Sequence, residues 1–396
     1  MSWVSTWRRV AKQYQRSRLI RTLFLIVMTI LLLFLMVQSV STNQVKSTEI
    51  DRELVVKVSL DKLSEKLPFT YNSGLDYQDR RVLQSASLIA DIRWPRVAMA
   101  VFVGAALAIA GAAIQGVFRN PLAAPGLVGI SSGAAVGAVT AILLKTDFSD
   151  VLKTLPDIGL IDLSTLSGIR FAQTIFAFIG SLLATLLVYR LARSGGRTDT
   201  ASLLLIGFAV NTIGGAYVGL ATYIGDEAQT TDIIFWSLGS LTGINWQDVY
   251  LILPFVLVGS IILPLFARQF NVMTLGDAEA QHLGVNTERI RQLAMLLSAV
   301  MVGAAVSFAG IIGFIGLVIP HLMRLLFGPD HRIVLPSSLL GGAIFLVAAD
   351  MIGRSLPGPS IESGITIEVP VGVLTALVGG PFFLFLILFT QRRRGR

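Results

Sequence analysis

Long apolar runs separated by short polar segments follow one another along the whole chain. We count ten of them, and several are interrupted by Gly or Pro. They cover residues 19–40, 95–118, 121–144, 170–193, 201–224, 248–268, 291–312, 313–327, 335–353 and 369–390. A membrane-crossing helix needs about 20 apolar residues, whereas a strand of a membrane β-barrel needs about ten residues of alternating polarity. The pattern therefore predicts an all-α membrane protein with about ten transmembrane helices and excludes an isolated β-barrel.

Composition supports this class. Of the 396 residues 54% are hydrophobic and only 14% are charged, whereas a soluble chain carries about a quarter charged residues. The chain has no Cys, which removes disulfides and thiolate metal sites. The apolar run at 19–40 is longer than the core of a signal peptide and no convincing cleavage site follows it, so we expect a retained first span.

The basic residues predict the orientation. Lys and Arg crowd the first 21 residues and the tail after residue 391, and positive charge accumulates on the cytoplasmic side. We therefore expect both termini in the cytoplasm, an even number of spans across the membrane, and no nucleic-acid binding despite the net charge of +8. The expected parts are 1–40 (cytoplasmic end and first span), 41–94 (extracytoplasmic segment), 95–390 (transmembrane core) and 391–396 (basic tail). Four arginines on the outer side depart from the rule: Arg80, Arg81, Arg93 and Arg96.

Two segments of the chain resemble each other. Residues 103–121 and 302–320 share Val, Gly, Ala, Ala, Ala, Gly and Pro at matching positions. An odd number of predicted spans separates them, so the two copies would have opposite orientations. This predicts an inverted repeat of five helices, an architecture of transporters whose substrate path lies near the repeat interface. A duplication without transport, or coincidence in a Gly- and Ala-rich chain, are the alternatives.

Polar residues and prolines punctuate both copies. Gln115, Asn120 and Pro121 follow a stretch of small residues, and Pro320, His321 and Arg324 lie in the second copy. Proline interrupts the helical hydrogen bonds, and ionisable groups at membrane depth usually face a cavity or a partner. We therefore predict a broken or short helix around Pro121 and an interrupted hydrogen-bond ladder at Pro320, and we place these six residues on a translocation path. The alternatives are ordinary helix packing and, for His321, a structural hydrogen bond; a heme ligand is the less favoured reading of that histidine.

Two further segments carry charge. Asp350 and Arg354 are four residues apart and can pair on one helical face; a structural ion pair or an arginine exposed at the outer mouth is favoured over a proton relay. Between the sixth and seventh runs lies a predicted cytoplasmic loop that can form a short helix closed by Gly284. By itself this loop could equally be an ordinary solvated connection.

Taken in order, these segments resemble one family. The chain contains R-W-P-R, G-A-A-L-A-I-A-G, Q-G-V-F-R-N-P-L-A-A-P-G, F-I-G-L-V-I-P-H-L-M-R, G-P-D-H-R and V-P-V-G-V-L-T-A-L-V-G-G-P-F-F. Over roughly residues 75–392 it is similar to the FecCD-type permeases of bacterial type II ABC importers for ferric siderophores, heme and cobalamin. The resemblance implies a BtuC-like fold with ten helices per subunit.

The resemblance also implies partners and sites. It implies a homodimer with its path on the two-fold axis, two ATP-binding subunits that hold ATP and Mg, and an extracytoplasmic substrate-binding protein that docks on Arg93, Arg96 and Arg354. It implies that the loop between the sixth and seventh runs couples to the ATPase. That loop comprises Gly276, Asp277, Ala278, Glu279, Ala280, Gln281, His282, Leu283, Gly284, Val285 and Asn286. Contact with lipid headgroups is the alternative role of the outer arginines.

We therefore expect an importer permease that works by alternating access on an iron chelate, heme or a ferric siderophore, with cobalamin as the alternative. The chain has no G-x-x-x-x-G-K-[S/T], so it should not hydrolyse ATP, and we expect it to bind no cofactor or metal of its own. An ion-coupled secondary transporter would need more mid-membrane carboxylates than Asp350, Glu362 and Glu368. An intramembrane enzyme would need a nucleophile with its base, or a metal-binding pair, and neither is present. The sequence does not identify the chelate or a role for residues 41–75.

Overall fold

A computed structural model describes residues 2–41, 52–64, 74–75, 77–154, 167–194, 197–356 and 368–394. Glu362 and most of the segment 41–75 outside α2 lie beyond these described residues. The first half contains α1 (Ser2–Ser41), α2 (Arg52–Ser64), α3 (Arg80–Ser87), the π-helix η1 (Leu88–Arg93), α4 (Trp94–Phe118), the 3₁₀ turn η2 (Pro125–Val128), α5 (Ile130–Leu143), α6 (Ser149–Thr154), α7 (Gly168–Leu191), β1 (Arg193–Ser194), β2 (Arg197–Thr198) and α8 (Thr200–Ile224). The second half contains α9 (Glu227–Leu238), α10 (Trp246–Leu265), α11 (Ala267–Met273), α12 (Asp277–His282), α13 (Thr287–Ala309), α14 (Ile315–Phe327), α15 (His331–Ser355) and α16 (Val371–Arg394).

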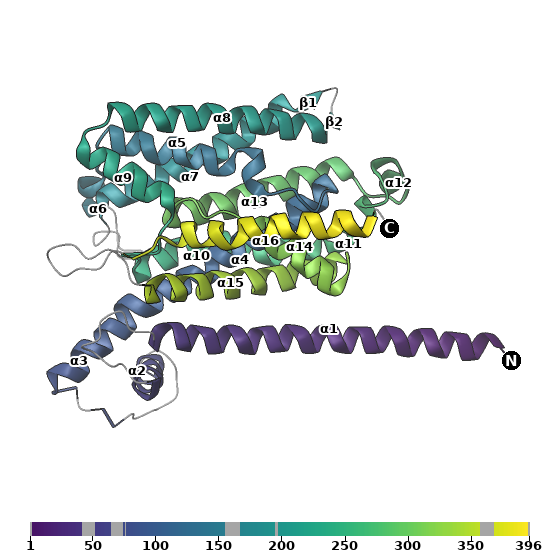
Figure 1. The fold of residues 1–396 in the computed structure, drawn as a ribbon, viewed down its shortest axis with the longest axis horizontal. Helices are drawn as coiled ribbons and strands as arrows, with labels where there is room; N and C mark the ends of the chain where they lie inside the picture. Colours follow the sequence, from purple (N-terminus) through teal and green to yellow (C-terminus); the bar gives the residue numbers. More distant parts are fainter. Residues whose placement is uncertain are drawn as a thin grey trace.

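All ten predicted apolar runs form helices. Seven helical segments of the described residues are long and apolar enough to cross a membrane, and α5, α14 and the apolar part of α16 are shorter apolar helices. The long helices run side by side, with the chain termini, α12 and the β1–β2 hairpin at one end of the bundle and α2, α3, α6 and α9 at the other (Figure 1). Two termini at one end require an even number of crossings, as predicted. We call the end with the termini the inner end and the other the outer end.

Helix α4 is the centre of the bundle. It is buried on nearly every side, against α15, α13, α14 and α10. Small residues make this possible: a Cβ atom on Gly104 would collide with the carbonyl of Gly342 in α15, and one on Gly111 with the carbonyl of Gly316 in α14. Lipid offers little hydrophobic drive for helix association, so such close backbone contact is a main source of packing energy.

The packing of the two halves supports the inverted repeat. Helix α4 begins next to α3 at the outer end, whereas α13 begins next to α12 at the inner end, so the two related helices run in opposite directions (Figure 1). Their contacts correspond as well: α4 packs against α15 and α13 packs against α7, while α5 packs against α7 and α14 against α15. The predicted fold class, an all-α bundle with an inverted repeat, is therefore confirmed, with the two-residue strands β1 and β2 as a small addition at the inner end.

Local breaks agree only in part with the prolines. After Phe118 the chain turns at Arg119, which has a positive φ of 49°, and α5 begins only at Ile130, so the predicted break around Pro121 is confirmed. At Pro320 the helix itself does not end, because α14 continues through this residue to Phe327. Pro320 lies near the start of a short helix, where its missing amide removes a single internal hydrogen bond.

Candidate functional site

A cluster of four charged side chains lies at the outer end of the core. Arg96 Nη2 is 2.8 Å from Asp350 Oδ1 and 2.6 Å from Glu368 Oε2, and Arg354 Nε is 3.0 Å from Asp350 Oδ2. The predicted pairing of Asp350 with Arg354 is therefore confirmed as a structural ion pair. Asp350 is 1% exposed and Arg354 7%, so the cluster is internal to this chain. Because both oxygens of Asp350 are held by guanidinium groups, this carboxylate is not a free proton carrier.

The outer arginines also hold the end of the first span. Arg93 donates a hydrogen bond of 2.6 Å to the carbonyl of Val40, and Arg354 donates to the carbonyl of Ser39 at 3.0 Å and to its hydroxyl. The last carbonyls of a helix have no partner within the helix and carry partial negative charge, which arginine satisfies. All three arginines predicted to dock a binding protein thus have guanidinium groups engaged inside the chain, Arg96 and Arg354 in ion pairs and Arg93 in a hydrogen bond.

The R-W-P-R segment is positioned by a π-helical turn. Helices α3, η1 and α4 form one continuous helical segment, Arg80–Phe118. The wide turn η1 lies just before Pro95 and accommodates a residue that has no backbone N–H. The indole of Trp246 donates a hydrogen bond of 2.8 Å to the carbonyl of Ala90 within this turn, and that of Trp94 donates to the Ser59 hydroxyl of α2. These bonds fix the helix that carries Arg93 and Arg96.

The predicted path residues Gln115 and Arg324 meet near the inner end of α4. Gln115 is 2% exposed and donates from Nε2 to the carbonyl of Leu317 at 3.1 Å, while its Oε1 accepts from Arg324. Arg324 also donates to the carbonyl of Ala112 at 3.3 Å. In the single chain the two side chains therefore join α4 to α14, with Gln115 buried and Arg324 half-buried.

This contact continues into a network that the sequence analysis missed. Arg324 Nη2 is 3.4 Å from His331 Nε2, and the other ring nitrogen of His331 donates to Asn271 Oδ1 at 2.8 Å. Asn271 in turn donates to Asp330 at 2.7 Å, and Asp330 accepts from Arg21 of α1 at 3.1 Å. Burial opposes ionisation of Asp330, but these bonds and the backbone N–H of Arg332 outweigh it and lower the pKa of this carboxyl below 3.8. The G-P-D-H-R motif, which contains Asp330 and His331, is the sequence feature from which this network could have been predicted.

The other predicted path residues have different surroundings. Asn120 Oδ1 accepts from the N–H of Leu122 at 2.9 Å and stabilises the turn after α4. The imidazole of His321 lies beside the backbone of Pro121, but within the described part of the chain both of its ring nitrogens are buried without a hydrogen bond of normal geometry. His321 therefore has a backbone group of Pro121 as its neighbour but no structural hydrogen bond of normal geometry there. Among the described residues no group of three or more metal-binding side chains occurs that would make it part of a metal site.

The predicted coupling loop forms a short helix at the inner end. Gly276, with φ of 123°, turns the chain into α12, which Gly284, with φ of 81°, follows. Ala280 is buried against the bundle, whereas Leu275 and Leu283 are 61% and 62% exposed. The exposed side chains on and beside α12 include Leu275, Ala278, Glu279, Gln281, His282 and Leu283, and we call this set of six the α12 surface. Exposed leucines beside polar groups are typical of a protein contact.

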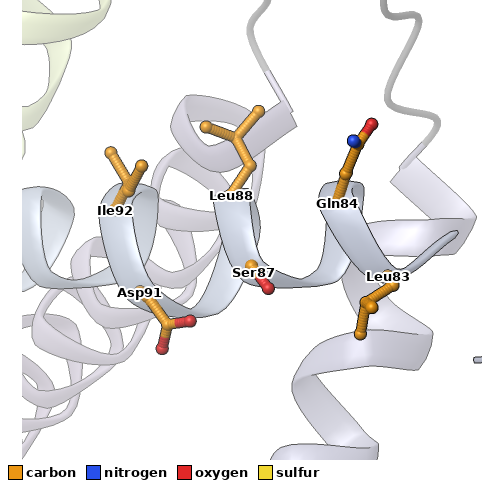
Figure 2. A pocket seen from close by; sticks show the side chains of 6 residues that line it. All are labelled: Leu83, Gln84, Ser87, Leu88, Asp91 and Ile92. Atoms are coloured by element: carbon orange, nitrogen blue, oxygen red, sulfur yellow. The ribbon is translucent and has the colours of Figure 1, made fainter. Parts of the chain in front are cut away.

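A shallow hollow of about 520 Å³ lies at the outer end and is unrelated to these groups. Its lining comes from one continuous helical stretch, α3 and η1, as Figure 2 shows. The lining residues are Leu83, Gln84, Ser87, Leu88, Asp91 and Ile92. The lining does not include any of the predicted path residues, so we do not assign this hollow to the translocation path.

A multi-pass bundle with an inverted repeat, short apolar helices in both halves and an exposed helix at the inner end defines a membrane transport subunit. The chain belongs to the FecCD transport family, whose model matches residues 24–389. It is 44% identical over 300 residues to the cobalamin import system permease protein BtuC of Halobacterium salinarum, covering 76% of this chain and 73% of the relative. It is also 44% identical over 304 residues to the hemin transport system permease protein HmuU of Yersinia pestis, covering 77% and 84%. A solved inward-facing transporter described as of the metal-chelate ABC type has a TM-score of 0.68 and 29% identity, covering 93% of this chain and 99% of that one.

Proposed function

We propose that this chain is the permease subunit of an ATP-driven importer that carries an iron chelate, heme or a ferric siderophore, across the cytoplasmic membrane of a bacterium. The FecCD match and the hemin permease relative support this substrate class. Cobalamin is the second candidate, because the cobalamin permease relative is equally similar. Both termini and α12 would face the cytoplasm, in agreement with the basic residues at the two chain ends.

The observation that carries the proposal is the α12 surface. A short helix that is anchored by Ala280 and exposes Leu275 and Leu283 has the form of a docking element. In the proposed assembly two copies of the chain enclose the path, each α12 surface contacts one ATP-binding subunit that holds ATP and Mg, and a substrate-binding protein docks at the outer end. Alternation between outward and inward openings would follow from movement of α12. The paired state of Asp350 argues against the rival, an ion-coupled secondary transporter.

Purification of the tagged chain from native membranes in mild detergent tests the class. We expect two copies of the chain with two ATP-binding subunits, and vesicles that contain this complex should take up substrate from its loaded binding protein only with ATP inside. Hemin, a ferric siderophore and cobalamin are the three substrates to compare. Uptake that follows an ion gradient in vesicles without an ATPase would instead establish the secondary transporter.

Substitutions in the α12 surface test its role. Glu279→Arg and His282→Glu should lower ATP-driven uptake roughly tenfold or more, because a new charge that meets a like charge across a contact costs several kcal/mol. The control is Arg332→Glu, an exposed charge reversal outside α12 at the same end of the bundle. The thermal stability of all three chains should match that of the unsubstituted protein. Unchanged uptake in both α12 variants would show that this surface is not the docking element.

The outer arginines need a separate test, since Arg96 and Arg354 are held in ion pairs within the chain, whereas Arg93 makes a hydrogen bond to the Val40 carbonyl. We expect Arg93→Glu to weaken binding of the substrate-binding protein in a salt-dependent way. Arg80→Glu, at the exposed tip of α3, gives the comparison. If only Arg80→Glu weakens binding, the docking charges lie on α3, and the three predicted arginines serve to hold α1 and α15.

A further inference from the structure

Asp277 is the first residue of α12, and its two carboxylate oxygens bind two different helices. Oδ1 accepts from Arg119 Nη2 at 2.5 Å, and Oδ2 accepts from Arg291 Nη2 at 3.2 Å. Arg119 follows the last residue of α4, and Arg291 lies in the first turns of α13. One carboxylate therefore connects α12 to the two long helices that occupy equivalent places in the inverted repeat.

The α4 branch has an unusual backbone. Arg119 has φ of 49°, in the left-handed region, and closes α4 with hydrogen bonds from its own N–H to Gly116 and from the N–H of Asn120 to Gln115. Glycine is the residue that usually occupies this position, because a Cβ there is unfavourable. An arginine at the same place gives α4 a side chain that reaches α12.

The α13 branch is buried and leads further into the bundle. The Arg291 side chain is 3% exposed, and it also donates to Glu288 Oε2 at 2.9 Å. Glu288 accepts from the Tyr189 hydroxyl of α7 and from the Thr198 hydroxyl of β2, both at 2.6 Å. Through Glu288 the branch therefore reaches α7 and the β1–β2 hairpin.

From this geometry we propose that Asp277 is the positioning residue that transmits movement of α12 to α4 through Arg119, and to α13, α7 and the hairpin through Arg291 and Glu288. The inference rests on the proposed coupling of α12 to an ATP-binding subunit. Charge-assisted hydrogen bonds are short and directional, and the Arg291 branch is buried whereas the bond between Arg119 and Asp277 is partly exposed. A displacement of Asp277 must therefore displace the groups that it holds or release them. The α12 surface would bind the ATPase, while Asp277, on the bundle side, would pass the movement on.

The natural absence of cysteine allows a direct measurement. Leu122, 37% exposed just after the turn at Arg119, is replaced by Cys in the full complex with its ATP-binding subunits, and the rate of maleimide labelling is measured with and without ATP. We expect ATP to change this rate. Asp277→Asn and Arg119→Gly should each reduce the ATP-dependent change roughly fivefold or more, in the range of typical coupling between sites.

The variants separate coupling from folding. Arg119→Gly removes the side chain and places glycine where the backbone favours it, so a loss cannot be attributed to backbone strain. The double variant should be no worse than either single one, because both break the same contact. Glu288→Gln leaves the bond between Arg119 and Asp277 in place and should preserve the response at residue 122. Arg289→Gln, an exposed change on the same end of α13, is the matched control and should respond as the unsubstituted chain does.

Each outcome of the labelling experiment either supports or overturns the proposed role of Asp277. Retention of ATPase subunits and of hydrolysis in Asp277→Asn, with the labelling response lost, supports transmission. An unaltered response overturns it, as does loss of the ATPase subunits or of thermal stability in Asp277→Asn, which would make Asp277 a docking or structural residue. If the unsubstituted chain recruits no ATP-binding subunit at all, the proposed function itself fails, and this result is visible before any variant is made.

Discussion

Replacing Asp350 by Asn should destabilise the bundle strongly, because this carboxylate neutralises the outer cluster. Asp350 and Glu368 balance Arg96 and Arg354, and Asp350 is the carboxylate that touches both arginines. In Asp350→Asn the buried guanidinium of Arg354 loses the carboxylate that pairs with it, while Arg96 keeps Glu368. Removing one partner of a buried ion pair costs about 3–5 kcal/mol, which is mostly the penalty for the charge left behind.

An exposed pair supplies the matched control. Asp150 and Lys153 form an i,i+3 pair at 3.2 Å whose side chains are 100% and 66% exposed, and such pairs contribute at most about 0.5 kcal/mol. The same substitution, Asp150→Asn, should therefore leave the free energy of unfolding nearly unchanged. The expected difference between the two variants is about 2.5 kcal/mol or more, close to a hundredfold in the unfolding equilibrium.

Reversible unfolding of the detergent-solubilised chain in increasing denaturing detergent measures this difference, with thermal melting as a second readout. Arg354→Met is informative beside Asp350→Asn, because it leaves Asp350 paired with Arg96 and removes the bonds to Ser39. If Asp350→Asn is no less stable than Asp150→Asn, the outer cluster is hydrated or open in solution, and the argument from burial is refuted.

Two further results follow from the packing and the charges. Gly111→Ala should lower the melting temperature markedly, because the added Cβ overpacks against the carbonyl of Gly316 at a cost of about 1–3 kcal/mol. Gly215→Ala in α8, where nothing lies within 4 Å of the added Cβ, should be close to neutral. Equal melting temperatures of the two variants would contradict the close approach of α4 and α14. The pKa of the Asp330 carboxyl is lowered in the folded chain, because its hydrogen bonds outweigh its burial. The ionised carboxylate therefore stabilises the fold at neutral pH, and this contribution is lost as the pH falls through the lowered pKa. Melting curves should therefore show an advantage over Asp330→Asn that is full near neutral pH and shrinks below about pH 4; an advantage that is constant with pH would exclude the ionic bond to Arg21.

Much of the fold follows from the apolar pattern, because a membrane restricts the chain to helices of a required length. The ten runs, the even number of crossings and the opposed halves are each found in the structure. Breaks were harder to predict, since the effect of a proline depends on its place in the helix: Pro121 follows the end of α4, and Pro320 lies inside α14. Helix α9 was not expected, because it is held by a capping box between Asp226 and Gln229 and not by an apolar run.

The site could be predicted less completely, because the sequence does not show which partner a charged side chain contacts or whether the side chain is buried. The pairing of Asp350 with Arg354 is local in sequence and was foreseen. The contacts of Arg96 with Glu368 and of Arg119 with Asp277 join residues far apart in the chain, and a single sequence contains no signal for them. The same holds for the burial of Arg354, which appeared from the sequence as an outer charge and is enclosed between α1 and α15.

The distribution of polar contacts along α4 has a consequence for how the bundle can move. The middle of α4 is lined with small residues and packs by close backbone contact, while its polar contacts are concentrated near its ends, with Arg96 outside and Gln115 and Arg119 inside. Close-packed interfaces resist gradual deformation, so movement is expected as a switch between discrete arrangements. The outer contacts are buried ion pairs, whereas the bond between Arg119 and Asp277 has side chains that are 33% and 42% exposed. Exchange of partners therefore costs least at the inner end. A cysteine reporter at Leu83, on the outer part of the same helical segment, should accordingly respond less to ATP than one at Leu122, and equal responses would mean that the segment moves as one rigid rod.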